Sequence, residues 1–204
     1  GFDTTDDMNG VEPTGVGVVP MNNQKGVRMS TAITHLAPMR HHLNLTIRGN
    51  VFARKILIEK RQGTGVEVES GGEVFTVESN KVVISAGALK SPHILMLSGI
   101  GPKDQLDEYG IDVLQDTPGV GANLRNHPIS PISFRVKEGI KLQPDASGVR
   151  IALRYTAKGS DDSNDMMMTT SSLFSPFTGE MLPDRIGRIS CVIELPAGVG
   201  FVRL

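Results

Sequence analysis

The stretch "KVVISAGALKSPHILMLSGIGP", Lys81 to Pro102, decides the fold class. It opens with an apolar run, Val82 to Ser85, that is typical of a short buried strand. Small residues follow, and Ser91-Pro92 then indicates a helix start, because proline in a first helical turn needs no N–H partner. A strand that enters a helix through a small-residue turn is the unit from which parallel sheets are built. We therefore predict a mixed α/β fold with Val82 to Ser85 as a parallel strand.

The flanking sequence extends this prediction in both directions. Upstream, alternating apolar residues between Val51 and Glu78 predict a β-meander, with a hairpin turn at Gly71–Gly72 because both positions tolerate positive φ. Downstream, a second helix is predicted near Lys103 to Tyr109, ended by Gly110. After Pro128 the pattern is again strand-like. We expect these later strands to start a second, antiparallel sheet.

The first forty residues carry weaker signals. Gly1 to Gly26 is rich in Gly, Asn, Pro and Asp and predicts an extended loop segment. Ser30 is a candidate N-cap for a helix that runs to about Met39. Ile33 and Leu36 have the spacing of one buried helix face.

Composition excludes several classes of protein. Hydrophobic residues make up 39% and charged residues 21% of 204 residues, which is typical of a globular chain. The net charge of −1 gives no reason to expect nucleic acid or an anionic membrane as a partner. There is no transmembrane run and no signal peptide, and the lone Cys191 allows no internal disulfide, which fits a cytoplasmic protein. Because the chain lacks an initial Met and stops at "GVGFVRL" as a strand pattern begins, we expect a fragment.

Single short motifs in the chain support no site by themselves. Four Gly-x-Gly pairs begin like a dinucleotide-binding fingerprint, but the third glycine position holds Pro20, Asp104, Leu124 and Arg203 in turn. We interpret these glycines as loop residues. The five histidines lack ligand spacing to Cys or carboxylates, so no metal site is predicted.

Several ordered blocks together resemble the glucose-methanol-choline (GMC) oxidoreductase family of flavoproteins. "AGALKSPHILMLSGIG" resembles the family's second signature, and "PGVGANLRNHP" resembles a downstream block, with Asn126 in place of the usual Asp. "GVRMSTAITHLAPM", "NLTIRGNVFARKILIE" and "GVEVES" follow the family's order upstream. The resemblance covers most of the chain up to Pro128 and continues more weakly beyond it.

The resemblance implies a domain organisation and an activity. Residues 1–128 would be the central part of a Rossmann-like FAD-binding domain with a β-meander, and residues 129–204 the truncated start of a substrate-binding domain with an antiparallel sheet. The parent enzyme would be a choline dehydrogenase-like, FAD-dependent alcohol dehydrogenase or oxidase that transfers hydride from a small-molecule alcohol to the flavin. The electron acceptor, oxygen or a quinone, stays open. The family's catalytic histidine is expected beyond Leu204, so this chain alone would be inactive.

The resemblance also implies cofactor-binding residues. In the family, a small residue in a strand of the meander holds the adenine edge through its backbone N–H and C=O, which places this contact at Ala53. A register error of one residue would move it to Phe52 or Arg54. The turn of Ser85, Ala86 and Gly87 would let the backbone approach the AMP half of FAD, although such residues also serve close helix–strand packing alone.

Asn126, His127 and Pro128 complete the predicted cofactor-binding set as a support on the flavin side. His127 could instead transfer a proton, but its place in the family's block favours the support role.

Two other functional classes remain open from the sequence. One is an FAD-retaining relative with carbon–carbon lyase chemistry, such as a hydroxynitrile lyase. The other is a truncated, non-catalytic remnant. A membrane-peripheral parent is the alternative to a cytoplasmic one.

Overall fold

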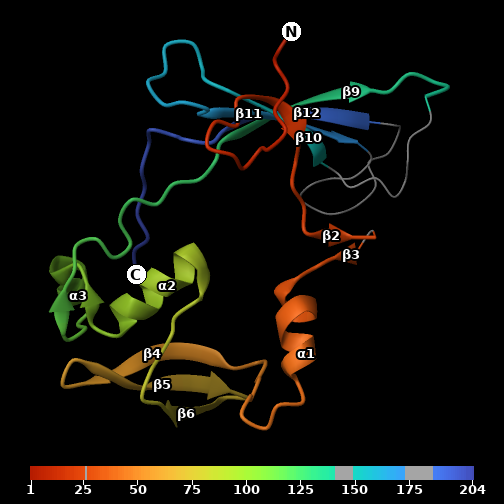
Figure 1. Cartoon of the computed structure of the whole chain (residues 1–204). Helices are drawn as coiled ribbons and strands as arrows, with labels where there is room; N and C mark the ends of the chain where they lie inside the picture. Colours follow the sequence, from red (N-terminus) through yellow and green to blue (C-terminus); the bar gives the residue numbers. More distant parts are fainter. Residues whose placement is uncertain (26, 141–148, 173–185) are drawn as a thin grey trace. The chain divides into compact units, whose positions relative to one another are not determined.

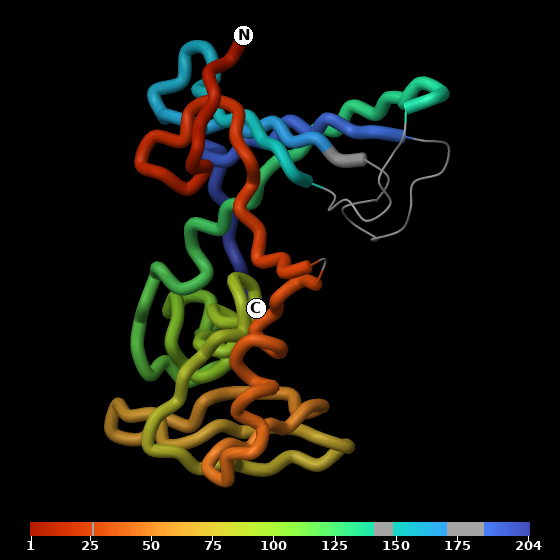
Figure 2. The backbone as a smooth tube through the Cα atoms, turned by 45° about the vertical axis from the view of Figure 1, so that its right-hand side comes forward, coloured from red at the N-terminus to blue at the C-terminus, as the bar shows by residue number. Residues whose placement is uncertain are grey.

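The computed structural model describes residues 1–25, 27–140, 149–172 and 186–204. The chain folds into two compact units (Figures 1 and 2). The first unit combines Gly1–His42 with Asn126–Ala197, and the second combines Leu43–Arg125 with Gly198–Leu204. These units are defined by which residues contact each other, and their bounds differ from those of the domains expected at 1–128 and 129–204. The functional assignment of those two domains stays a prediction. The mixed α/β class is confirmed.

The first unit is built on a five-stranded antiparallel sheet. Its strand order is β1-β10-β11-β12-β9. The strands are β1 (Gly15–Val18), β9 (Ile129–Arg135), β10 (Val149–Tyr155), β11 (Met166–Ser172) and β12 (Ile186–Ile193). The antiparallel sheet predicted after Pro128 is therefore confirmed. Gly15–Val18 was expected in a loop, and that expectation is wrong because β1 pairs with β10, which no local pattern can indicate.

Short elements follow β1 in the same unit. A two-stranded ribbon of β2 (Asn23–Gln24) and β3 (Val27–Arg28) leads to a π-helical turn, η1 (Ala32–Leu36), and then to α1 (Ala37–Met39). The predicted helix is present, but its N-cap is Thr31 and no side chain caps it. Ile33 and Leu36 are 44% and 38% exposed, so the predicted buried face is wrong within the described part of the chain. Their spacing places them on one side of the helix, whereas burial also requires a packing partner.

The second unit contains the predicted meander. β4 (Phe52–Glu59), β5 (Gln62–Ser70) and β6 (Glu73–Glu78) form an antiparallel sheet in that order. Gly71 and Gly72 make the turn between β5 and β6 with φ of 62° and 85°, as predicted. Figure 1 shows α2 beside this sheet. Met96, Leu106 and Val68 form the buried apolar part of this unit, and Met8, Ala152, Leu153 and Val192 that of the first.

The segment from Lys81 to Pro102 differs from its prediction in two respects. Val82–Ser85 is extended, but it pairs with no strand among the described residues, so its prediction as a parallel strand is wrong there. A strand requires a hydrogen-bonded neighbour, and among the described residues the one parallel pair of strands is β7 (Ile100–Gly101) with β8 (Gln115–Asp116).

The second difference is the start of the helix. α2 spans Gly87–Leu97 and begins four residues before Ser91, with Pro92 inside it. Ser91 Oγ accepts a hydrogen bond from the N–H of Ala86 at 3.2 Å, so this serine lies inside the helix and binds the residue that precedes it. α3 (Lys103–Glu108) ends at Tyr109, and Gly110 follows with φ of 65°, which confirms the predicted stop.

No helix in the described ranges is long and apolar enough to cross a membrane.

Candidate functional site

The backbone of Ala53 lies at an outer sheet edge and has no hydrogen-bond partner among the described residues. Ala53 lies opposite Val68 of β5, and β5 pairs continuously with β6 from Gly65 to Ser70. Ser79 N donates to Thr64 O at 2.9 Å, so the backbone of Thr64 points towards β6. Because backbone groups alternate along a strand, Val68 also points towards β6, and the Ala53–Val68 pair exchanges no hydrogen bonds. The N–H and C=O of Ala53 therefore point away from β5, at the edge of the sheet that β4 forms.

A hydrogen bond further along β4 supports this direction. Ile56 N donates to Ser98 Oγ at 2.8 Å, so the backbone of Ile56 also points away from β5. The register shifts between Ala53 and Lys55, which makes Arg54 the extra residue of a β-bulge.

The same register distinguishes the neighbouring candidates. Phe52 lies opposite Glu69, whose backbone alternates with that of Val68 and points towards β4, so Phe52 is used in the ladder. The Arg54 side chain lies 3.2 Å from Glu67 and 2.7 Å from Glu69 in two ion pairs. Ala53, rather than Phe52, presents a free donor and acceptor side by side. The sequence did not show the bulge that sets this direction.

The turn of Ser85, Ala86 and Gly87 is exposed and leads into α2. Gly87 has φ of 84°, and no atom lies within 4 Å of the position that a Cβ would occupy there. The backbone of Gly87 is therefore open to close approach. The first amides of α2 have no partner within the helix, as at every helix start. The residues of this turn and Ala53 all belong to the second unit.

The turn of Asn126, His127 and Pro128 belongs to the first unit and is tied to the end of β12. Ile193 N donates to Pro128 O at 3.1 Å, and Asn126 Oδ1 accepts the N–H of His127 at 3.0 Å. His127 Nδ1 lies 3.6 Å from Glu194 Oε2. Sequence reasoning missed Glu194, because nothing local to it indicates a partner so far upstream.

The glycine-rich block from Gly119 to Leu124 precedes this turn and forms backbone hydrogen bonds with Gly200 and Val202 near the end of the chain. Gly121 has φ of 80°, and Val202 N donates to Gly121 O at 2.7 Å. A Cβ on Gly121 would lie far inside van der Waals contact with the carbonyl oxygen of Val202. Leu124 and Gly200 exchange two backbone hydrogen bonds of 3.0 and 2.7 Å. The block therefore has a structural role within the second unit.

A family model described as GMC oxidoreductase matches residues 1–129, more than half of the chain. The chain belongs to the GMC oxidoreductase family. Oxygen-dependent choline dehydrogenases of Photobacterium profundum and Rhizobium meliloti are 47% and 45% identical to it over 128 residues. The matched part is 62% of this chain but 22% and 23% of those proteins. The chain thus spans less than a quarter of the length of these GMC relatives.

Solved structures agree with the GMC assignment. Pyridoxine 4-oxidase from Mesorbium loti matches the whole chain with a TM-score of 0.82 at 25% identity, over 41% of its own length. A formate oxidase also matches the whole chain with a TM-score of 0.82, at 20% identity and over 44% of its length. The latter likeness shows a shared fold.

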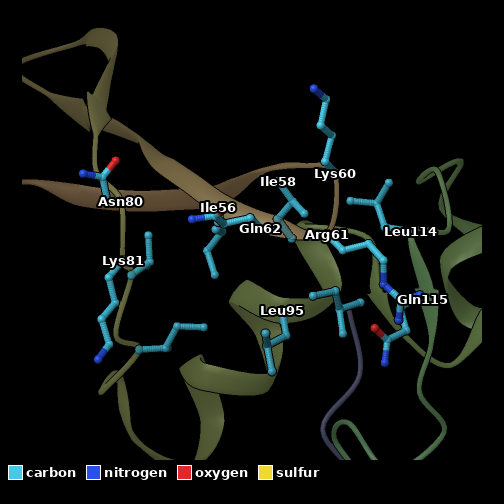
Figure 3. Close-up of a pocket in the computed structure, with 14 residues that line it drawn as sticks. Ile56, Ile58, Lys60, Arg61, Gln62, Asn80, Lys81, Leu95, Leu114 and Gln115 are labelled. Carbon is cyan, nitrogen blue, oxygen red and sulfur yellow. The ribbon is translucent and has the colours of Figure 1, made fainter.

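This GMC chain also has a large pocket within its second unit (Figure 3). The pocket has a volume of about 670 Å³ and lies between β4, the extended segment from Asn80 to Ile84, and α2. Ile56, Ile58 and Leu95 give it apolar walls. Its charged lining residues, Lys60, Arg61 and Lys81, are all basic. The half-buried side chains of the unpaired Val82–Ser85 segment, Val82 and Ile84, face this pocket.

Proposed function

We propose that the chain is part of an FAD-dependent oxidoreductase that acts on the CH–OH group of a small-molecule alcohol. Residues 1–128 would belong to the cofactor domain and residues 129–204 to the substrate domain. Membership of the GMC family supports this function. The observation that carries it is the free backbone edge at Ala53, because a paired N–H and C=O match the donor and acceptor on an adenine edge.

The residues present fit an adenine dinucleotide. Ala53 has a small side chain on an edge strand, so a flat ring can approach its backbone. The open backbone at Gly87 and the start of α2 fit the AMP half of the same ligand. When bound, the flavin supplies the acceptor for a hydride from the alcohol carbon. This chain's proposed share is to hold the adenine end through Ala53 and the Ser85–Gly87 turn.

His127 is proposed as a support rather than as a proton acceptor. Its partner Glu194 and the Pro128–Ile193 hydrogen bond hold the turn against β12. A histidine beyond Leu204 would accept the hydroxyl proton. The names of the relatives include an oxygen-dependent dehydrogenase and oxidases, which supports oxygen over a quinone as the electron acceptor. The single Cys191, which has no disulfide, supports a cytoplasmic site of action.

The test is anaerobic stopped-flow reduction of the flavin in the full-length parent protein by a series of primary alcohols. We expect the flavin to be reduced by at least one of them. In the His127→Ala variant, flavin content or stability should fall, while reduction normalised to bound FAD should change little. A variant that binds FAD normally but is reduced about a hundred-fold slower would make His127 the proton acceptor. A parent that no alcohol reduces but that cleaves cyanohydrins would be a lyase instead.

A further inference from the structure

The two faces of the five-stranded sheet differ in chemistry. Residues opposite each other in an antiparallel sheet point to the same face, so the register assigns each side chain. Thr169, Ser190 and Pro131 are in register and share one face. On the other face, Ile189 lies opposite Ile132, and the ring of Phe134 covers Gly187. The first face therefore mixes hydroxyl and apolar side chains, while the second is apolar in this region.

The mixed face carries a groove of about 340 Å³ within the first unit. Its floor combines the apolar side chains of Ile129, Pro131, Met167 and Val192 with the hydroxyl groups of Thr169 and Ser190. This volume lies in the range of small-molecule sites, and an apolar floor with a few polar groups is typical of them.

Charged groups lie at the two ends of this groove. His127 and Glu194 contact each other at one end and compensate each other when the histidine is protonated. Arg188 lies at the other end, six residues from Glu194 along an extended chain and thus about 20 Å away. The Nε of Arg188 is shielded from solvent, and within the described ranges it has no hydrogen-bond acceptor. Among the groove residues, Arg188 therefore carries a positive charge whose shielded Nε donor has no acceptor among the described residues.

This end of the groove lies outside the part of the chain that the family model matches. The match ends at residue 129, where β9 begins, so β10, β11 and β12 lie beyond it. The substrates of the choline dehydrogenases therefore cannot be transferred to this groove by sequence similarity. The positive charge of Arg188 repels a quaternary ammonium group and attracts a carboxylate, and its Nε still has a hydrogen bond to donate.

We propose that the groove binds a small alcohol that bears a carboxylate, with the carboxylate on Arg188 and the hydroxyl group further along the groove. The inference rests on the proposed function for the role of the hydroxyl group. Binding of the carboxylate depends on Arg188 and the groove alone.

The first experiment measures binding without turnover. Flavin-loaded parent protein is titrated by calorimetry with three probes that carry no alcohol: 4-methylbenzoate, its neutral analogue 4-methylbenzamide, and benzyltrimethylammonium. We expect 4-methylbenzoate to bind at least about ten-fold more tightly than the amide, and the cation to bind most weakly. Equal binding of benzoate and amide, tighter binding of the cation, or no saturable binding of the benzoate would overturn the proposal.

Variants locate the site. Arg188→Gln should abolish the preference for 4-methylbenzoate, and Arg188→Lys should retain most of it because the charge remains. The matched control is Arg154→Gln, because Arg154 lies in β10 of the same sheet but does not line the groove. Its Nε is also shielded and has no partner in the described part of the chain. An unchanged preference in Arg188→Gln, or its loss in Arg154→Gln, would contradict the assignment.

Flavin reduction by 4-(hydroxymethyl)benzoate tests the proposed function separately. If benzoate binds but no alcohol reduces the flavin, the proposed function is wrong and the anion site is supported. If alcohols reduce the flavin but benzoate is not preferred, the anion site is wrong and the proposed function is supported.

Discussion

Individual residues of this chain have roles that follow from backbone direction rather than side-chain chemistry. Ala53 matters in our proposal because its N–H and C=O point to a free edge. Gly121 matters because the carbonyl of Val202 occupies the space of a side chain. Both roles can be tested by substitutions that change the backbone or add a single carbon.

Gly121→Ala should destabilise the fold. The added methyl group meets the Val202 carbonyl, and alanine disfavours φ of 80°, so we expect a loss of about 1–3 kcal/mol or more in the free energy of unfolding. Urea titration followed by circular dichroism measures it. Gly119→Ala is the matched control from the same block, because nothing lies within 4 Å of its Cβ position. Equal effects of the two substitutions would contradict the proposed role of Gly121.

Substitution by proline tests the edge at Ala53. Ala53→Pro removes an N–H that does not bond to β5, so the parent protein should stay folded. Its affinity for FAD should fall about ten-fold. Ala53→Val keeps the backbone groups and should be tolerated. Flavin content after gel filtration gives the measurement.

Phe52→Pro is the control for Ala53→Pro. The N–H of Phe52 faces β5, so we expect the Phe52→Pro substitution to lower the unfolding temperature of the meander. If Ala53→Pro destabilises the fold as much as Phe52→Pro does, the assigned backbone direction is wrong.

At the scale of elements, single polar side chains hold segments in place. Ser98 ends α2 and links it to β4, because its hydroxyl donates to Ile94 O at 2.6 Å and accepts the N–H of Ile56. Asp165 closes the loop between β10 and β11, where its carboxylate accepts the N–H of Ala157 at 2.8 Å. Both residues are buried, with 6% and 8% of their surface exposed. Their loss leaves backbone donors without a partner.

Ser98→Ala should cost about 1–3 kcal/mol of stability, because the Ile56 N–H then stays unsatisfied in a partly buried site. Chemical denaturation of the purified chain measures this loss. Ser130→Ala, at an exposed position of β9, should change stability by less than about 0.5 kcal/mol. A neutral result for Ser98→Ala would show that water replaces the hydroxyl.

Asp165 should make the fold sensitive to acid. The hydrogen bond from Ala157 N–H lowers the pKa of Asp165 below its ordinary value of 3.8. Because the folded-state pKa is below the unfolded one, the stabilisation is complete above about pH 4 and is lost as the pH falls through the folded-state pKa. Asp165→Asn should therefore flatten the acid side of a plot of unfolding free energy against pH. Asp161→Asn, at an exposed position of the same loop, is the matched control for the loss of one carboxylate.

At the scale of the whole molecule, much apolar surface is exposed for a chain of this length. Val83, Ile132 and Phe201 are among the large hydrophobic residues with more than 60% of their surface exposed. The chain also spans less than a quarter of its choline dehydrogenase relatives. The cofactor contacts proposed for it are backbone contacts at the adenine end and the support at His127.

These contacts are too few to hold a dinucleotide tightly. We expect the purified 204-residue chain to carry little or no flavin, while the full-length parent purifies yellow with FAD. Absorbance spectra, with FAD quantified after denaturation, decide the comparison. Stoichiometric flavin in the isolated chain would mean that the adenine end supplies most of the affinity.

The sequence by itself determined two kinds of feature: local turns and helix ends, and the family resemblance carried by several blocks in one order. The Gly71–Gly72 turn and the stop at Gly110 were predictable because glycine accepts positive φ at little cost. The GMC resemblance was predictable because several blocks occur in one order. Tertiary structure alone decided the pairing of β1 with β10, the absence of a described partner for Val82–Ser85, and the contact of His127 with Glu194. Each depends on hydrogen bonds or contacts between residues distant in sequence, and no local pattern encodes such a partner.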